Sequence, residues 1–420
     1  MATSRHRWLG AGTLLVGVGA ALAGSGVAHA DSAGGGVSRV ESSDSRAAGS
    51  VRALPRVRTP VVSVPAAAKT ARPGPARAAA APRSGSAPRP ASRAAAPVTT
   101  YRVANPIPSR RQWYTNSGYC GEMSFVSAGL NYGQYMSQYD ARALASNNGR
   151  QNLRSSQLLL GVNDVAAAKA MHLRAVPFNT AKQTGTAQFL SWVKSNVTAG
   201  YPVVIGVYMN QRSFYGSANP NAGDAEYDHI VTVTGFSSTR PLTTPAAYYS
   251  DDVITFSDNG LWTGTPDGLP QYVFSYALGG FPATRRQANS AQAPVYSLSS
   301  GADYGIAITG VADLDRETVP VRLTTSVNGE SPAIANGSNA RPAAKPVTLT
   351  ITVSGLTAGK TYNLYRYNTM AAVPDSRFNA SAGKASQKWT IAATGPTYTL
   401  TQTVMSNEIA AYRAVPVTAR

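Results

Sequence analysis

The sequence predicts an α+β domain followed by an all-β sandwich. Between residues 101 and about 200, apolar residues recur at helical spacing, whereas from residue 202 to about 276 they form runs of strand length. Helices first and strands afterwards are typical of an α+β domain, in which helices are segregated from an antiparallel sheet. After residue 300 only short strand-like segments and turn residues follow, which favours two packed sheets.

Residues 1–30 have the pattern of a secretory signal peptide. Arg5 and Arg7 precede an apolar stretch that runs from Leu9 to about Leu22, and the small residues Ala28 and Ala30 flank His29. The apolar stretch is too short to span a bilayer comfortably. We therefore expect an exported, secreted protein that is cleaved after Ala30.

Residues 31–100 form a spacer of Ala, Pro, Ser and Gly, with eleven Lys or Arg residues against three Asp or Glu residues. Too few aromatic and branched apolar residues are present to offset the entropy of ordering the backbone, so we expect disorder or partial polyproline II. The spacer is a solvated linker, a tether to an anionic cell wall or membrane surface, or a cleaved pro-segment. Because much of the net charge of +18 lies here, we do not expect a nucleic-acid-binding protein.

Three helices are predicted in the first half of the domain at residues 101–290. The first begins just after Cys120 and runs from about residue 121 to 140, where Met123, Val126, Leu130, Tyr135, Met136 and Tyr139 recur at helical spacing. The second ends at Ala170, with Asn163 or Asp164 as its cap. The third runs from about residue 186 to 197, with Phe189, Leu190 and Val193 on its inward face, and Gly200 ends the helical region.

Strands are predicted at residues 202–209, 229–236, 253–256 and 271–276, with a polar loop at 210–228. A joint near residues 287–297 separates this domain from the predicted sandwich at 300–420. Its strands are predicted at residues 304–309, 319–325, 347–353, 361–367, 387–392, 397–403 and 410–415, and Asn328-Gly329 is one of the turn signals between them.

Cys120 is the only cysteine, so no intramolecular disulfide can form. It is a buried apolar residue, half of an intermolecular bridge, or a functional thiol. At a helix start, free backbone N–H groups and the helix dipole favour a thiolate. Gly118 and Gly121 beside it let the backbone approach a substrate closely.

His229 and His172 are the two histidines that follow the predicted cleavage site. His229 begins a predicted strand, where a base could face the helix end, whereas His172 lies among apolar residues and is expected to be structural. Asp258 and Asn259 end the following strand, and either could orient an imidazole. A nucleophile, a base and an orienting residue are sufficient for acyl transfer through a thioester.

We expect no metal and no cofactor. One cysteine and two histidines at these separations match no zinc-ligand spacing, and the sequence has no phosphate-binding glycine loop or dinucleotide fingerprint. A monomer that acts on a peptide or protein substrate is the expected form.

Three segments resemble the papain-like cysteine peptidase superfamily. NSGYCGEMS at residues 116–124 is similar to the start of its cysteine-bearing helix, particularly in the bacteriocin-processing branch. GYPVV at 200–204 resembles the strand entry before the histidine in that branch, and DHIVTVTGF at 228–236 resembles the histidine strand of the superfamily. The resemblance covers roughly residues 105–285.

The resemblance implies a papain-like domain with Cys120 as nucleophile and His229 as base. Asp258 lies where the bacteriocin-processing branch has its Asp, and Asn259 beside it is similar to the Asn of papain. The superfamily supplies a Gln before the cysteine as an oxyanion donor. Gln112, eight residues before Cys120, is farther away than usual, and Asn116 lies only four before; we favour Gln112.

Glu122 departs from the small residue or Pro that is usual after Cys-Gly. Its carboxylate would oppose a thiolate at Cys120, unless the side chain points away from the thiol or contacts substrate.

The function that follows is a secreted cysteine hydrolase, most readily a peptidase that cleaves amide bonds through a thioester. The alternatives are a cell-wall peptide hydrolase or an amide transferase on the same scaffold, or a non-catalytic surface-binding protein. Glu122 is the one feature that favours a non-catalytic protein.

Overall fold

A computed structural model describes residues 99–182, 185–210, 229–243, 245–262, 271–283, 296–299, 303–325 and 332–417. The predicted signal peptide, nearly all of the predicted spacer, most of the loop at 210–228 and the turn Asn328-Gly329 lie outside these residues. Within them the chain is mixed α and β with mostly antiparallel sheets, as the sequence predicts. None of the helices described is both long and apolar enough to cross a membrane.

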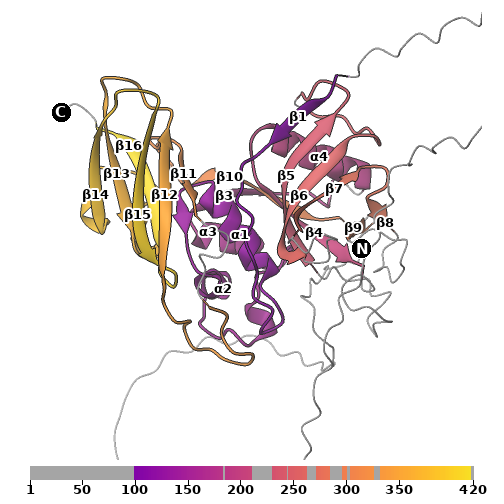
Figure 1. Ribbon diagram of the computed structural model, residues 1–420, viewed down its shortest axis with the longest axis horizontal. Coiled ribbons are helices and arrows are strands. Elements are labelled where there is room, and N and C mark those ends of the chain that lie inside the picture. Colours follow the sequence, from indigo (N-terminus) through magenta and orange to yellow (C-terminus); the bar gives the residue numbers. More distant parts are fainter. Residues whose placement is uncertain are drawn as a thin grey trace, which may run out of the picture. The chain divides into compact units, whose positions relative to one another are not determined.

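The first sheet has the strand order β3-β10-β4-β5-β6-β7 (Figure 1). These strands are β3 (Leu173–Pro177), β10 (Gly305–Val311), β4 (Val203–Met209), β5 (His229–Ser238), β6 (Val253–Trp262) and β7 (Gln271–Ala277). β1 (Tyr101–Ala104) pairs with the C-terminal part of β5, and β9 (Tyr296–Ser299) pairs with the end of β4 and with β8 (Pro282–Ala283).

Helices pack on both faces of this sheet, and β4 shows why its sequence is continuously apolar. Val204 and Tyr208 belong to one hydrophobic cluster with α1 (Cys120–Leu130), α2 (Gln138–Ser146) and α3 (Asp164–Ala170). Val203 and Ile205 belong to a second cluster with α4 (Thr186–Thr198). Because alternate side chains of a strand point to opposite faces, both faces of β4 are buried. Short 3₁₀ turns occur at Arg154–Ser156, Met370–Ala372 and Ala382–Lys384.

The prediction of a single helix at residues 121–140 is wrong. α1 ends at Leu130, β2 (Gln134–Tyr135) follows, and α2 begins at Gln138. Gly133 makes the break, since its φ is +70° and a Cβ there would lie 2.9 Å from the carbonyl oxygen of Tyr412. Ser137 then starts α2, because its Oγ accepts a hydrogen bond from the backbone N–H of Asp140 at 3.1 Å.

Two more differences concern strands. β1, β3, β8 and β9 were not predicted, and β3 lies between α3 and α4, so helices and strands are less segregated along the chain than expected. The strand predicted at residues 304–309 does form, as β10, but it pairs with β3 and β4 rather than with the C-terminal sheets. The chain therefore changes from one sheet system to the next after β10.

The C-terminal residues form two further sheets that share one hydrophobic cluster. One has the order β11-β12-β15, with β11 (Val321–Thr324), β12 (Pro346–Ser354) and β15 (Thr397–Met405). The other has the order β14-β13-β16-β2, with β14 (Gln387–Ala392), β13 (Thr361–Tyr367) and β16 (Ala410–Pro416). Leu349 and Ile351 of the first sheet and Leu364 and Tyr412 of the second lie in that cluster. Six of the seven predicted strands match these elements.

Two glycines of α1 provide a test of how tightly this helix is packed. A Cβ at Gly121 would lie 2.0 Å from the carbonyl oxygen of Leu158, whereas a Cβ at Gly129 would meet only ordinary contacts, the nearest at 3.5 Å. We expect Gly121→Ala to destabilise the protein by about 1–3 kcal/mol through overpacking. Gly129→Ala should be neutral or stabilising by up to about 1 kcal/mol. Denaturant unfolding followed by circular dichroism measures both, and equal effects would contradict this packing.

Candidate active site

Three neighbouring elements bring Cys120, His229 and Asp258 together. Cys120 is the first residue of α1, His229 is the first residue of β5, and Asp258 lies within β6. α1 packs on β5, and β5 pairs with β6, so the helix start and the two strands meet. Cys120 is 6% exposed and His229 is 3% exposed, so the pair is largely removed from water.

The His229 ring is hydrogen-bonded to a carboxylate and is also influenced by Cys120. Nε2 lies 3.0 Å from Oδ1 of Asp258, and Cys120 is near enough to act electrostatically on the ring. Burial by itself lowers the pKa of His229, but hydrogen bonds and opposite charge from Asp258 and Cys120 outweigh it and raise this pKa to about 10. The charged imidazolium is therefore the favoured form of His229 near neutral pH.

Asp258 is itself held in place by further donors. Its Oδ1 accepts the backbone N–H of Gly260 at 2.6 Å, and its Oδ2 accepts the hydroxyl of Tyr296. The Tyr296 ring also stacks on His229, with ring centroids 5.4 Å apart and an interplanar angle of 17°. Burial and the neighbouring Asp258 raise the pKa of Tyr296, which keeps its phenol neutral and able to donate.

Tyr296 was missed by the sequence analysis. It was placed in the joint between the two predicted domains, where Gln, Ala, Ser and Pro surround it. The structure instead puts it at the start of the short strand β9, beside Met209 of β4. A strand of four residues is too short to show which strand it pairs with, so the sequence around Tyr296 did not indicate that it lies beside His229.

Asn259 lies next to this group but forms no hydrogen bond with the imidazole. Its Nδ2 donates to the carbonyl oxygens of Cys120 (2.9 Å) and Ile230 (3.0 Å) and to Oγ of Ser124 (3.1 Å). The backbone carbonyl oxygen of Asn259 accepts a hydrogen bond from the backbone N–H of Gln112 at 2.8 Å. Of the two candidate orienting residues, Asp258 therefore faces His229, whereas Asn259 fastens α1 to β5 and β6.

Gln112 and Asn116 also have different surroundings. Oε1 of Gln112 accepts the backbone N–H of Tyr119 at 3.2 Å, which leaves Nε2 with no hydrogen-bond partner in the described part of the chain. Asn116, in contrast, uses both ends of its amide: Nδ2 donates to Ser338 (3.0 Å), and Oδ1 accepts from Gly337 (2.6 Å). Of the two side-chain amides, Gln112 is therefore the one whose NH₂ group is available to donate a hydrogen bond to another acceptor.

The Glu122 side chain forms a buried ion pair. Its Oε1 lies 2.6 Å from Nε of Arg142 and also accepts the backbone N–H of Leu158 at 3.0 Å. Glu122 and Arg142 are 1% and 0% exposed. The negative charge of Glu122, which is unusual in the sequence, is therefore balanced by Arg142, and the carboxylate also accepts a backbone hydrogen bond.

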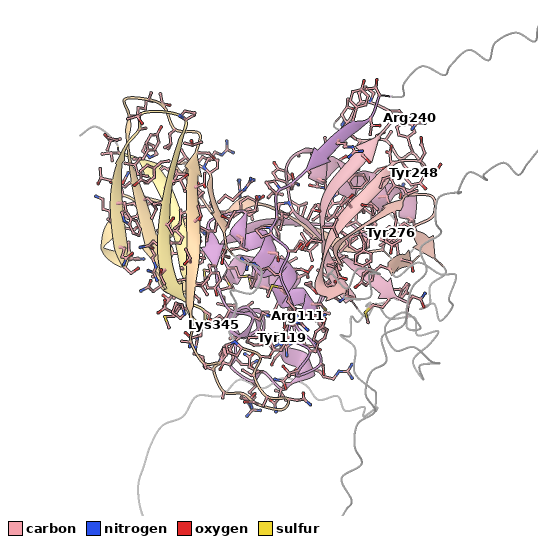
Figure 2. All side chains as sticks on the ribbon, in the orientation of Figure 1. Arg111, Tyr119, Arg240, Tyr248, Tyr276 and Lys345 are labelled. Carbon is pink, nitrogen blue, oxygen red and sulfur yellow. The ribbon has the colours of Figure 1, made fainter. Side chains whose placement is uncertain are left out.

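Arg142 also shapes the segment that precedes the cysteine. Its guanidinium donates to the carbonyl oxygens of Asn116 (3.0 Å), Gly118 and Gln151 (2.8 Å). It lies over the Tyr119 ring, 3.5 Å from the centroid, and the Tyr119 side chain lies beside helices α1 and α2 (Figure 2). One buried guanidinium thus fixes the backbone immediately before Cys120.

His172 lies elsewhere. Its Nδ1 is 2.6 Å from Oδ1 of Asp375 in an ion pair whose side chains are 20% and 49% exposed. His229 is therefore the histidine that the fold brings to Cys120. Among the described residues, no group of three or more His, Cys, Asp or Glu side chains is placed to hold a metal ion.

A scan against protein-family models and a search of the curated proteins each found no match to this chain.

The buried ion pair gives a prediction about stability. Glu122→Ala leaves Arg142 charged and buried without its carboxylate, so we expect a loss of about 3–5 kcal/mol in the free energy of unfolding. The matched control is Asp251→Asn, which breaks the exposed pair between Arg240 and Asp251 and should leave stability nearly unchanged. Thermal and urea unfolding compare the variants, and a Glu122→Ala protein as stable as wild type would contradict the role assigned to this pair.

Proposed function

We propose that this chain is a papain-like cysteine hydrolase that cleaves amide bonds in peptides or proteins through a thioester on Cys120. The observation that carries the proposal is the buried group of Cys120, His229 and Asp258, in which Nε2 of His229 lies 3.0 Å from Oδ1 of Asp258 and Cys120 helps to raise the pKa of the ring. A cysteine at a helix start, a strand histidine and a carboxylate behind it are the parts needed for nucleophilic acyl transfer.

Each step has a residue of this chain in a suitable place. The imidazolium of His229 stabilises the thiolate of Cys120, whose Sγ attacks the substrate carbonyl carbon. Nε2 of Gln112 and the backbone N–H of Cys120, in the first turn of α1 where no intrahelical acceptor exists, would donate to the developing oxyanion. His229 then protonates the leaving amine, and it accepts a proton from the water that hydrolyses the thioester. Asp258 holds the ring through its hydrogen bond to Nε2.

The papain-like identity is supported by order as well as by geometry. Cysteine, histidine and aspartate follow one another along the chain, on a helix and two antiparallel strands respectively. The C-terminal sheets are consistent with a β-sandwich appended to the hydrolase domain. Secretion rests on residues 1–30, and attachment to a cell wall or another anionic surface rests on residues 31–100.

The non-catalytic alternative loses its one supporting feature, because Glu122 pairs with Arg142 rather than opposing the thiol. The cell-wall hydrolase and amide transferase alternatives use the same three residues. Substrate assays separate them: a peptide library, peptidoglycan stem peptides, and a peptide substrate supplied with an amine acceptor.

The decisive experiment is covalent labelling of Cys120 with an affinity-tagged epoxysuccinyl peptide. We expect mass spectrometry to locate the label on Cys120. We also expect His229→Asn to slow labelling by at least about 100-fold, because the thiolate loses its imidazolium partner. Cys120→Ser should abolish both labelling and hydrolysis. His172→Ala is the matched control and should behave as wild type; equal labelling of the His229→Asn and wild-type proteins would reject the proposal.

The proposed ion pair also predicts how activity depends on pH. Because the pKa of His229 is raised to about 10, activity should persist through neutral pH and fall as the imidazolium deprotonates near pH 10. Asp258 favours the charged ring, so Asp258→Asn should lower this pKa and move the alkaline fall to lower pH. The pH profile of kcat/KM measures the shift, and an alkaline limb that does not move would contradict it.

A further inference from the structure

A second site lies at the other end of α1. A pocket of about 540 Å³ is lined by residues from the α1–β2 turn, from β3 and β10, and from β11 and β16. Its wall includes Asn131, which directly follows α1, whereas Cys120 begins that helix of eleven residues. At a rise of ~1.5 Å per residue the two ends are separated by about 16 Å. The pocket is therefore distinct from the candidate active site.

Positive charge dominates the wall of this pocket. Arg174, Arg316, Arg322 and Arg413 line it, and the carboxylate in its lining is that of Asp313. Among the described residues, none of the four guanidiniums forms an ion pair with a carboxylate. Asp313 directs Oδ2 to the backbone N–H (2.8 Å) and hydroxyl (2.7 Å) of Thr318. The wall thus carries an excess of three positive charges.

Among these arginines, Arg413 gives the strongest indication of a bound anion, because it is only 1% exposed. Its Nη1 donates to the carbonyl oxygens of Tyr132 (3.3 Å) and Tyr412 (2.8 Å). Nε and Nη2 are buried without a hydrogen-bond partner in the described part of the chain. Burial lowers the pKa of Arg413 to about 10, although Asp313 and Asp375 attract the charge from a longer range. A buried cation with two idle donors is costly unless something accepts from it.

The backbone has unusual conformations beside Arg174 and at Arg316. The pairing of β10 with β3 shifts register at Gly310, whose φ is +154°. A Cβ at Gly310 would lie 2.8 Å from Nη2 of Arg174, so this guanidinium lies closely against the bulge. Arg316 is held at φ +56°, an uncommon conformation for a non-glycine residue.

We propose that this pocket binds a small polyanion whose carboxylate or phosphate oxygens accept hydrogen bonds from Arg413 and from the three arginines around it. Guanidinium forks match the oxygens of both groups in bidentate pairs. The volume of about 540 Å³ is within the range of small-molecule sites. Tyr132, Tyr201 and Tyr412 also line the pocket and offer ring surface to a carbon skeleton.

Isothermal titration calorimetry of the full chain at low salt tests this proposal with two probes, citrate for carboxylate chemistry and inorganic pyrophosphate for phosphate chemistry. Arg322→Gln and Arg174→Gln each remove one charge from the pocket wall and should weaken binding at least tenfold. Arg240→Gln is the matched control: Arg240 follows β5 and lies at the far end of the first sheet, where it pairs with Asp251 (Figure 2).

Binding of either probe that depends on Arg322 but not on Arg240 supports the proposal, and the stronger probe identifies the anion chemistry. Cys120→Ser should bind the probes as wild type does, because the pocket and the thiol are separate. Arg413→Met, if it melts at the wild-type temperature, should lose binding altogether. The proposal is overturned if neither probe binds, or if Arg240→Gln weakens binding as much as Arg322→Gln.

Discussion

The candidate site depends on a single side-chain amide. Nδ2 of Asn259 holds the carbonyl oxygens of Cys120 and Ile230, so the first residue of α1 stays beside the second residue of β5. Because Asn259 follows Asp258 directly in β6, the carboxylate that faces His229 is placed by the same strand. The hydrogen bonds of Asn259 therefore fix α1, β5 and β6 relative to one another.

The sequence nominated residues that the fold brings close together, whereas parts of the predicted path of the chain were wrong. Cys120 directly precedes a predicted helix, His229 begins a predicted strand and Asp258 follows the next predicted strand, so residue type together with element order was enough to nominate them. The break after Leu130 was missed because the buried residues of β2 continue the helical spacing of apolar residues. The partner of β10 was also missed, since an apolar strand pattern does not reveal which sheet it joins.

Side-chain orientation was the other part that the sequence could not supply. Asp258 and Asn259 are neighbours in β6, and alternation along a strand sends their side chains to opposite sides. The pattern alone does not say which side faces the histidine. The carboxylate of Glu122 is paired with Arg142, twenty positions away in the chain, and the sequence did not predict this pairing. Long-range contacts of this kind have no signature in a local window.

The strand β2 has a consequence for how this molecule can be divided. It lies between α1 and α2, yet it pairs with β16 near the end of the chain, and the backbone N–H of Tyr412 donates to Gly133 at 2.7 Å. Proteolysis that removed the last strands would leave this edge of the helical region unpaired, only one helix length from Cys120. The C-terminal sheets thus support the segment that joins α1 to α2, and the two regions are not structurally independent units.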